Sequence, residues 1–250
     1  MAEKTPGVVD PFNRDVAENA GYRYTTNAQL SSQMANRRLT EVALEATEFR
    51  GRRVLDVGCG DGSYTVELFD QGGPSSMHGI DPAANAIETA RRNAGNRAIA
   101  FSCESAARLP FERGAFDLAH LRGVLHHMDD PRAGVAEALR VATKIVIIEP
   151  NGYNPVLKLL ERFSPYHREH GERSFTHRTL DRWIRDAGGA VRSRRWAGLV
   201  PFFCPDLPAR VLKRIEPAFE GLAPLNLLSC AVYVVVAEQA GSPSPGVRGV

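Results

Sequence analysis

Short runs of apolar residues alternate with stretches of helical periodicity along most of this chain. Five runs, rich in β-branched residues, lie at 53–57, 77–81, 98–103, 115–121 and 144–150. Their length and composition predict β-strands, and most of them are followed by a segment with apolar residues at helical spacings. This alternation predicts an α/β fold with a mostly parallel sheet and helices on both of its faces.

Two later runs, 190–196 and 228–237, predict the last strands and raise the expected number to seven. Helix starts are marked by Asp130 before Pro131 and by Thr176. Asp and Thr side chains accept hydrogen bonds from the first helical turn, and Pro fits within that turn.

Three segments fall outside this pattern. Residues 27–49 have apolar residues at mixed helical spacings, which predicts one or two helices ahead of the first strand. Residues 151–174 and 201–227 exceed what the sheet needs, and the second is expected to contain a short apolar helix with Val211 and Ile215. Both insertions leave from, or return to, the carboxyl ends of the strands, where ligands of open α/β sheets bind. We therefore expect a substrate lid made of all three segments.

These features divide the chain into four parts. We expect an N-terminal helical cap over 1–49, a ligand-binding core over 50–150, and the rest of the sheet with its lid insertions over 151–240. The Ser, Pro and Gly content of residues 241–250 predicts a disordered tail.

Composition excludes several classes of protein. With 250 residues, of which 43% are hydrophobic, the chain is long enough to bury a full core. A net charge of +2 is too small to indicate a surface that binds a polyanion, so we expect no nucleic acid partner. The four cysteines form no C-x-x-C pair, which fits a reducing, cytoplasmic location. The longest apolar run is too short for a membrane span, and the first residues lack the apolar run of a signal peptide.

The first strand ends in a turn that contains Gly58, Gly60 and Gly62. Glycine leaves the backbone open to a ligand, and the helix after the turn is expected to point free N–H groups at that ligand. A dinucleotide fingerprint, G-x-G-x-x-G, would place its third glycine one residue later. Asp56 would repel a pyrophosphate and attract a cation. The turn therefore predicts a nucleotide-type ligand that carries positive charge.

The second strand ends at Asp81, roughly 20 residues after the turn. An acidic side chain at this offset accepts hydrogen bonds from the hydroxyls of a bound ribose. Asp81 would also suit the N-cap of a helix that begins at Pro82. The two functions are compatible, and the order strand, turn, helix, strand and acid favours ribose binding.

The stretch from Leu55 to Gly62 resembles motif I, L-D-x-G-x-G-x-G, of the Rossmann-like class I methyltransferases, which use S-adenosylmethionine (SAM). Residues 115–131 resemble the F-D-x-V and V-L-H-H section of members that act on small metabolites. The resemblance covers about residues 50–150. It implies a seven-stranded sheet whose last strand is antiparallel, with SAM as the cofactor.

The resemblance also implies contacts with SAM from four residues of motif I and the second strand: Asp56, Gly58, Gly60 and Asp81. The adenine would lie beside Glu104, Ser105 and Ala106. Many members of the family carry an acid at the position of Ser105. Here either Glu104 replaces that acid, or the backbone of Ser105 and Ala106 holds the adenine.

His126 and His127 follow the fourth strand at the ligand edge. A hydroxyl or amine acceptor benefits from a base, and one of the two histidines is the expected base. Alternatively, both are structural parts of the V-L-H-H section. Contiguous side chains diverge, so at most one is expected to contact the substrate, and we expect no metal site among these histidines, Asp129 and Asp130.

Five further residues are candidates for substrate binding: Tyr22, Tyr24, Tyr153, His167 and His170. Each also has a structural explanation, since the tyrosines can pack against the domain and the histidines can face solvent.

The sequence favours a SAM-dependent methyltransferase that acts on a small molecule, with oxygen as the first expected acceptor atom and carbon or nitrogen as alternatives. Residues 123–126 differ from the [D/N/S]-P-P-[Y/F] motif of enzymes that methylate amino groups of nucleic acids and protein glutamine. Two alternatives share the fold: a SAM-binding protein without catalysis, and an enzyme with another reaction, such as a cyclisation. The glycine spacing disfavours a dehydrogenase, and the oligomeric state stays open.

Overall fold

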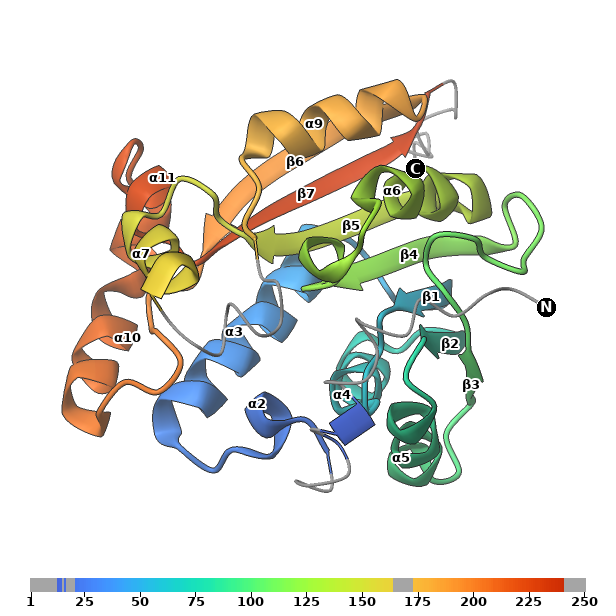
Figure 1. Ribbon diagram of the computed structural model, residues 1–250, viewed down its shortest axis with the longest axis horizontal. Helices are drawn as coiled ribbons and strands as arrows, with labels where there is room; N and C mark the ends of the chain where they lie inside the picture. Colours follow the sequence, from blue (N-terminus) through green and yellow to red (C-terminus); the bar gives the residue numbers. More distant parts are fainter. Residues whose placement is uncertain (1–12, 15, 17–20, 164–172, 241–250) are drawn as a thin grey trace, which may run out of the picture.

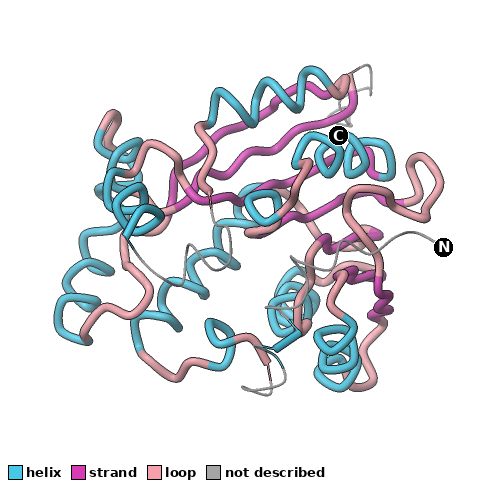
Figure 2. The backbone as a smooth tube through the Cα atoms, viewed as in Figure 1, coloured by secondary structure: helices cyan, strands magenta, loops and turns pink. Residues whose placement is uncertain are grey.

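The computed structural model describes residues 13, 14, 16, 21–163 and 173–240, without the side chains of Arg23 and Tyr24. The described residues form one sheet with helices on both faces (Figures 1 and 2). The predicted tail at 241–250 lies outside the described residues.

The sheet has seven strands in the order β3-β2-β1-β4-β5-β7-β6. Its strands are β1 (Arg53–Val57), β2 (Ser76–Asp81), β3 (Ile99–Cys103), β4 (Phe116–Arg122), β5 (Ala142–Pro150), β6 (Gly189–Ala197) and β7 (Val232–Gln239). β7 pairs antiparallel with β5 and with β6, and the other pairs are parallel. Figure 1 shows β7 running opposite to its neighbours. The predicted seven-stranded sheet with an antiparallel last strand is confirmed.

The helices are α2 (Arg23–Thr26), α3 (Leu30–Ala46), α4 (Ser63–Gly72), α5 (Ala84–Ala94), the 3-10 turn η1 (Leu125–His127), α6 (Pro131–Val141), α7 (Pro155–Phe163), α9 (His177–Asp186), α10 (Asp206–Gly221) and α11 (Leu225–Ser229). Two predicted N-caps are confirmed. The Asp130 side chain accepts hydrogen bonds from the first N–H groups of α6, and Thr176 does so for α9.

Alternating residues of the central strands fill two separate cores. On one face, Leu121 and Ile147 pack with residues of α6 and α9 such as Leu139 and Ile184. On the other face, Leu118 and its neighbours pack with residues of α3 and α4. The central strands are therefore buried on both sides, as near-continuous apolar runs predict for a parallel sheet.

The second insertion differs from its prediction. The strand expected from residue 228 begins at Val232, because Leu225–Ser229 form α11. The short apolar helix expected around Val211 is the 16-residue α10. Its residues Val211 and Ile215 are exposed, because its buried side carries Ala209 and Glu216.

Ion pairs hold α10 against α3. The Arg38 guanidinium donates to Glu220 at 2.6 and 2.9 Å and to Glu45 at 2.9 Å. Glu220 also accepts the N–H of Gly198 at 2.9 Å. The Arg38 and Glu220 side chains are only 9% and 7% exposed, and Glu216 nearby is 3% exposed. A buried charge needs its partner, so α10 depends on Arg38 for its place.

We expect Arg38→Met to lower the free energy of unfolding by about 3 kcal/mol, because it leaves two buried carboxylates without their guanidinium. Urea unfolding followed by circular dichroism measures this change. Arg53→Met is the control. It also removes an ion pair, with Asp117, but the Arg53 side chain is 52% exposed, so its loss should cost little. Equal losses in the two variants would contradict the assignment.

Candidate functional site

The candidate site lies where the strand order reverses. β1 is the third strand of the sheet and lies between β2 and β4, so the loops after β1 and β4 diverge at their carboxyl ends. This is the place where open α/β sheets bind ligands.

The glycine turn after β1 is packed closely between Val124 and the ring of Tyr22. Gly58 and Gly60 have φ of +70° and +55°, a region that L side chains rarely adopt. A Cβ on Gly58 would lie 2.3 Å from Val124, and one on Gly60 would lie 2.5 Å from the ring of Tyr22. Glycine is required here by conformation and by space.

The N–H groups of the turn already have acceptors within the chain. Gly58 and Cys59 donate to the carbonyl of Ile80 at 2.8 and 2.9 Å, and Gly60 donates to Asp81 Oδ2 at 3.1 Å. These three N–H groups of the turn itself are therefore not free, and the expectation of free N–H groups at the start of the following helix stays a prediction. A phosphate would have to break these bonds, because it binds through such groups.

Three buried carboxylates surround the turn instead. Asp56, Asp61 and Asp81 are 4%, 2% and 8% exposed. Burial, together with the negative charges of these three residues, raises the pKa of the Cys59 thiol well above its usual value. The local charge repels an anion and suits a cation. Asp61 was missing from the predicted site, although its position between two glycines of the turn was visible in the sequence.

Asp81 connects the end of β2 to the turn. Its Oδ1 accepts the N–H of Ala83 at 2.9 Å, and its Oδ2 accepts that of Gly60. The N-cap position of α5 is Ala83, so Asp81 is not the N-cap itself. It holds the N–H of the N-cap residue, two positions further along the chain. Burial raises the pKa of Asp81 to about 6 against the effect of these two hydrogen bonds.

Asp56 has partners that the sequence did not reveal. Its Oδ1 lies 2.7 Å from His120 Nδ1, on the neighbouring strand, and its Oδ2 accepts the Thr65 hydroxyl at 2.5 Å. These contacts join β1, β4 and α4 beneath the turn. Contact between Asp56 and SAM stays a prediction beside this structural function.

Glu149, at the end of β5, organises the loop after β4. This carboxylate is fully buried, and its Oε1 accepts the N–H groups of Val124 and Leu125, both at 2.8 Å. Its Oε2 lies 2.7 Å from His126 Nδ1. The Glu149 side chain therefore orients the ring of His126, a function that sequence reasoning missed although Glu149 was visible as the acid that ends the fifth strand.

The two candidate histidines differ in their surroundings. His126 is 7% exposed, whereas His127 is half-buried. Their rings lie 3.9 Å apart between centroids, because the 3-10 turn brings them together. The expectation that the adjacent side chains diverge is therefore wrong, and the pairing with Glu149 distinguishes His126 as the oriented ring.

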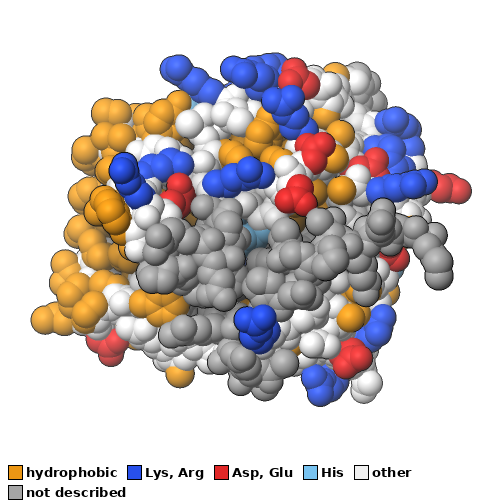
Figure 3. Space-filling model, viewed as in Figure 1, with side chains coloured by type: hydrophobic (Ala, Val, Ile, Leu, Met, Phe, Trp, Pro, Cys, Tyr) orange, Lys and Arg blue, Asp and Glu red, His pale blue; other side chains and the backbone are white. Residues whose placement is uncertain are grey.

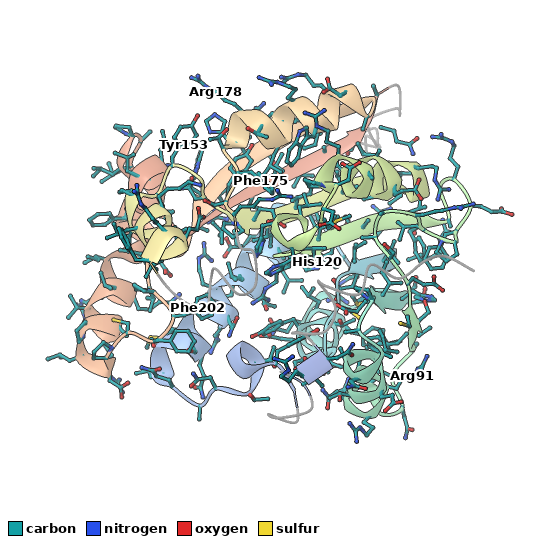
Figure 4. All side chains as sticks on the ribbon, in the orientation of Figure 1. Arg91, His120, Tyr153, Phe175, Arg178 and Phe202 are labelled. Atoms are coloured by element: carbon teal, nitrogen blue, oxygen red, sulfur yellow. The ribbon has the colours of Figure 1, made fainter. Side chains whose placement is uncertain are left out.

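The structure describes the side chains of two of the five predicted substrate-binding residues, Tyr22 and Tyr153. Tyr22 covers Gly60, is 4% exposed, and donates its N–H to Asp61 at 3.0 Å. The side chain of Tyr24, and both His167 and His170, lie outside the described residues. Tyr153 packs 5.3 Å from the ring of His177. Figure 4 shows Tyr153 well apart from His120 at the middle of the sheet.

The residues predicted beside the adenine follow β3. Glu104 donates its N–H to the carbonyl of Asp81 at 3.2 Å, so this loop begins next to the end of β2. Ser105 is exposed, and Glu104 and Ala106 are half-buried. Their contact with a ligand stays a prediction.

The described residues contain neither of two other kinds of site. Within them, no group of three or more His, Cys, Asp or Glu side chains is arranged to hold a metal ion. Nor does any described helix combine the length and apolar character that crossing a membrane requires.

Comparison with known proteins identifies the domain. Residues 55–147 match the family model described as a methyltransferase domain. The O-methyltransferase cnsE of Penicillium expansum is 32% identical over 164 residues, 59% of this chain and 58% of that protein. The tRNA U34 carboxymethyltransferase of Hahella chejuensis is 30% identical over 134 residues, 50% of this chain and 41% of that protein. The chain spans 37% to 61% of the length of curated relatives such as these.

Solved structures share the fold. A possible histamine N-methyltransferase from Thermotoga maritima has a TM-score of 0.67 and 19% identity, covering 93% of this chain and 99% of that one. A [4+2]-cyclase has a TM-score of 0.63 and 22% identity, covering 94% of each chain. At these identities the likeness concerns the fold alone. The predicted Rossmann-like methyltransferase fold and the family resemblance are confirmed.

We expect Asp61→Ala to release residues 21–26 from the glycine turn. Asp61 accepts both the Tyr22 N–H and the Thr25 hydroxyl, and losing a hydrogen bond to a charged group costs about 1.5–3 kcal/mol. The amide proton of Tyr22 should therefore exchange with solvent at least roughly tenfold faster, as hydrogen exchange measures. Asp130→Ala, which removes a cap elsewhere, should leave this proton unchanged. Unchanged protection in Asp61→Ala would show that other contacts hold the segment.

Proposed function

Because residues 55–147 form a methyltransferase domain, we propose that this chain transfers the methyl group of SAM to a small-molecule acceptor. Oxygen is the first expected acceptor atom, with carbon and nitrogen as alternatives. The observation that carries the proposal is the set of three buried carboxylates around a glycine turn whose N–H groups are bonded within the chain.

The residues of the turn fit SAM better than a dinucleotide. SAM, when bound, supplies an electrophilic methyl group on a positively charged sulfur. Asp56, Asp61 and Asp81 give the turn the negative charge that such a cation needs. Asp81 would accept the ribose hydroxyls, since each carboxylate oxygen keeps a second lone pair beside its backbone partner. Glu104, Ser105 and Ala106 would border the adenine, next to Asp81.

His126 would act as the base that takes the proton of the acceptor, and Glu149 would support it. With Nδ1 held by the carboxylate, Nε2 is the ring nitrogen that would take the proton of an acceptor hydroxyl. The Glu149 carboxylate would stabilise the imidazolium that this transfer forms, because it is buried 2.7 Å away. A base oriented in this way contributes typically 10²–10⁴-fold to a rate.

The names of relatives support a small-molecule acceptor without identifying it. One relative is an O-methyltransferase, but another acts on tRNA, so the expectation of no nucleic acid partner stays a prediction. The solved cyclase of the same fold keeps a different reaction as the second candidate function.

We expect S-adenosylhomocysteine to bind with micromolar affinity, about −8 kcal/mol, and NADH not to bind. The affinity should be full above pH 7 and fall roughly tenfold by pH 5, because Asp81, with a pKa of about 6, accepts ribose hydroxyls in its ionised form and gains a proton as the pH drops. Calorimetric titration at several pH values measures both effects.

Asp81→Asn is the control, because it keeps the size of the side chain and removes its titration. Its affinity should be lower by about 1–3 kcal/mol at pH 7 and should not change with pH. NADH binding alone would refute the cofactor assignment, and an equal pH slope in Asp81→Asn would refute the role of Asp81.

We expect His126→Asn to reduce turnover by about 10²–10⁴-fold with an acceptor found by screening, and to leave the affinity for S-adenosylhomocysteine unchanged. Glu149→Gln should lower turnover as well, because its amide cannot stabilise an imidazolium. His127→Asn is the matched control and should keep most of the activity. Equal activity in both histidine variants would remove the base assignment.

A further inference from the structure

The exposed apolar side chains of the described residues are concentrated on one part of the molecule. Every large hydrophobic side chain that is exposed there lies within 156–163 or 202–228, and all but Leu228 belong to the two predicted lid insertions, 151–174 and 201–227. Figure 3 shows the hydrophobic side chains gathered along the edge of the molecule that α7, α10 and α11 occupy in Figure 1. We call this surface the lid face.

The helices of the lid face are held together by asparagine side chains that donate to backbone carbonyls. Asn154 Nδ2, just before α7, donates to the carbonyls of Ser229 and Cys230 at the end of α11, both at 3.2 Å. Asn226 Nδ2, in α11, donates to the carbonyl of Glu220 in α10 at 3.1 Å. The three helices therefore form one surface.

α7 buries none of its residues. Val156, Leu159, Leu160 and Phe163 are 59%, 60%, 42% and 64% exposed. They recur at helical spacing, which puts them on one side of the helix. An apolar stripe of this kind is normally covered by another element.

α10 carries a second stripe and separates its charges by sign. Leu207, Val211 and Ile215 recur every four residues and are 74%, 54% and 38% exposed. Its acids Glu216 and Glu220 face inward to Arg38 and are nearly buried. Those two acids therefore contribute no negative charge to the side of α10 that faces solvent.

Most of the exposed charges beside both stripes are basic. Arg210 and Arg214 are exposed on α10, and Arg162 is exposed on α7. Glu161 of α7 is 16% exposed and is held by Lys158 and the N–H of Ser174. Asp206, at the start of α10, is the exposed acid of the two helices.

We propose that the lid face docks on the surface of an anionic lipid bilayer. An amphipathic helix with an apolar side flanked by Arg and Lys lies in the interface of such a membrane, where apolar burial and attraction to anionic headgroups add together. A second copy of this chain fits the charges less well. A two-fold symmetric contact centred on α10 would bring Arg210 and Arg214 close to the same residues of the partner, with Asp206 as the exposed acid of that helix.

The inference goes beyond the proposed methyl transfer, and its test needs no methyl donor. The full chain is sedimented with vesicles of phosphatidylcholine alone and with vesicles that contain about 30% phosphatidylglycerol, at low salt and at about 0.5 M NaCl. We expect it to sediment with the anionic vesicles at low salt and to remain largely in solution with the neutral ones.

Two variants and one control locate the contact. Leu207→Ser/Val211→Ser shortens the apolar stripe, and Arg210→Gln/Arg214→Gln removes two charges. We expect each to weaken binding to anionic vesicles by roughly tenfold or more. Arg132→Gln/Arg185→Gln removes two exposed charges from α6 and α9 and should bind like the unchanged chain. All the substituted side chains are exposed, so the midpoint of thermal unfolding should be the same in every variant.

Three results would overturn the proposal. The first is a chain that stays in solution with both kinds of vesicle at low salt. The second is equal binding by the lid-face variants and the control variant. The third is a dimer, seen by sedimentation velocity without vesicles, that Leu207→Ser/Val211→Ser dissociates while vesicle binding is absent; this result would assign the lid face to a second copy. None of these results depends on binding of S-adenosylhomocysteine, so this proposal and the proposed function fail independently.

Discussion

A carboxylate that is removed from water must be hydrogen-bonded, and this requirement positions the loops at the carboxyl edge of the sheet. Asp81 joins the end of β2 to the glycine turn, and Asp61 joins that turn to residues 22–25. Glu149 joins the end of β5 to the loop after β4. Each acid serves loops that are distant in sequence, so the shape of the site depends on three buried side chains.

The sheet and the glycine turn could be predicted because their signals are local. Apolar runs of strand length and three closely spaced glycines need no knowledge of distant residues. The contacts of Glu149 with His126 and of Asp61 with Tyr22 span 23 and 39 residues. Nothing in the residues beside either acid indicates which loop it will hold. The site could therefore be located from the sequence, but its hydrogen bonds could not.

The second insertion, part of the predicted lid, shows a different limit of sequence patterns. Val211 and Ile215 have the spacing of a buried stripe, and they are exposed. Periodicity shows that a helix has an apolar side, but the rest of the molecule decides whether that side faces the core. On α10 the inward side is fixed by Glu216 and Glu220, because their ion pairs with Arg38 require burial against α3. The apolar stripe is left on the outside.

Helix α3 connects that lid to the candidate site. Arg38 holds α10, and two residues to either side of it on the same helix Asn36 and Thr40 accept hydrogen bonds from Arg122, at the end of β4. The Arg122 guanidinium in turn lies 3.8 Å from the centre of the Tyr64 ring, in the helix that follows the glycine turn. A continuous series of contacts therefore runs from α10 through α3 to the helix after the glycine turn, and it fixes the position of α10 relative to the turn. If the lid face docks on a membrane as proposed, these contacts would keep the candidate site at a fixed position relative to that surface.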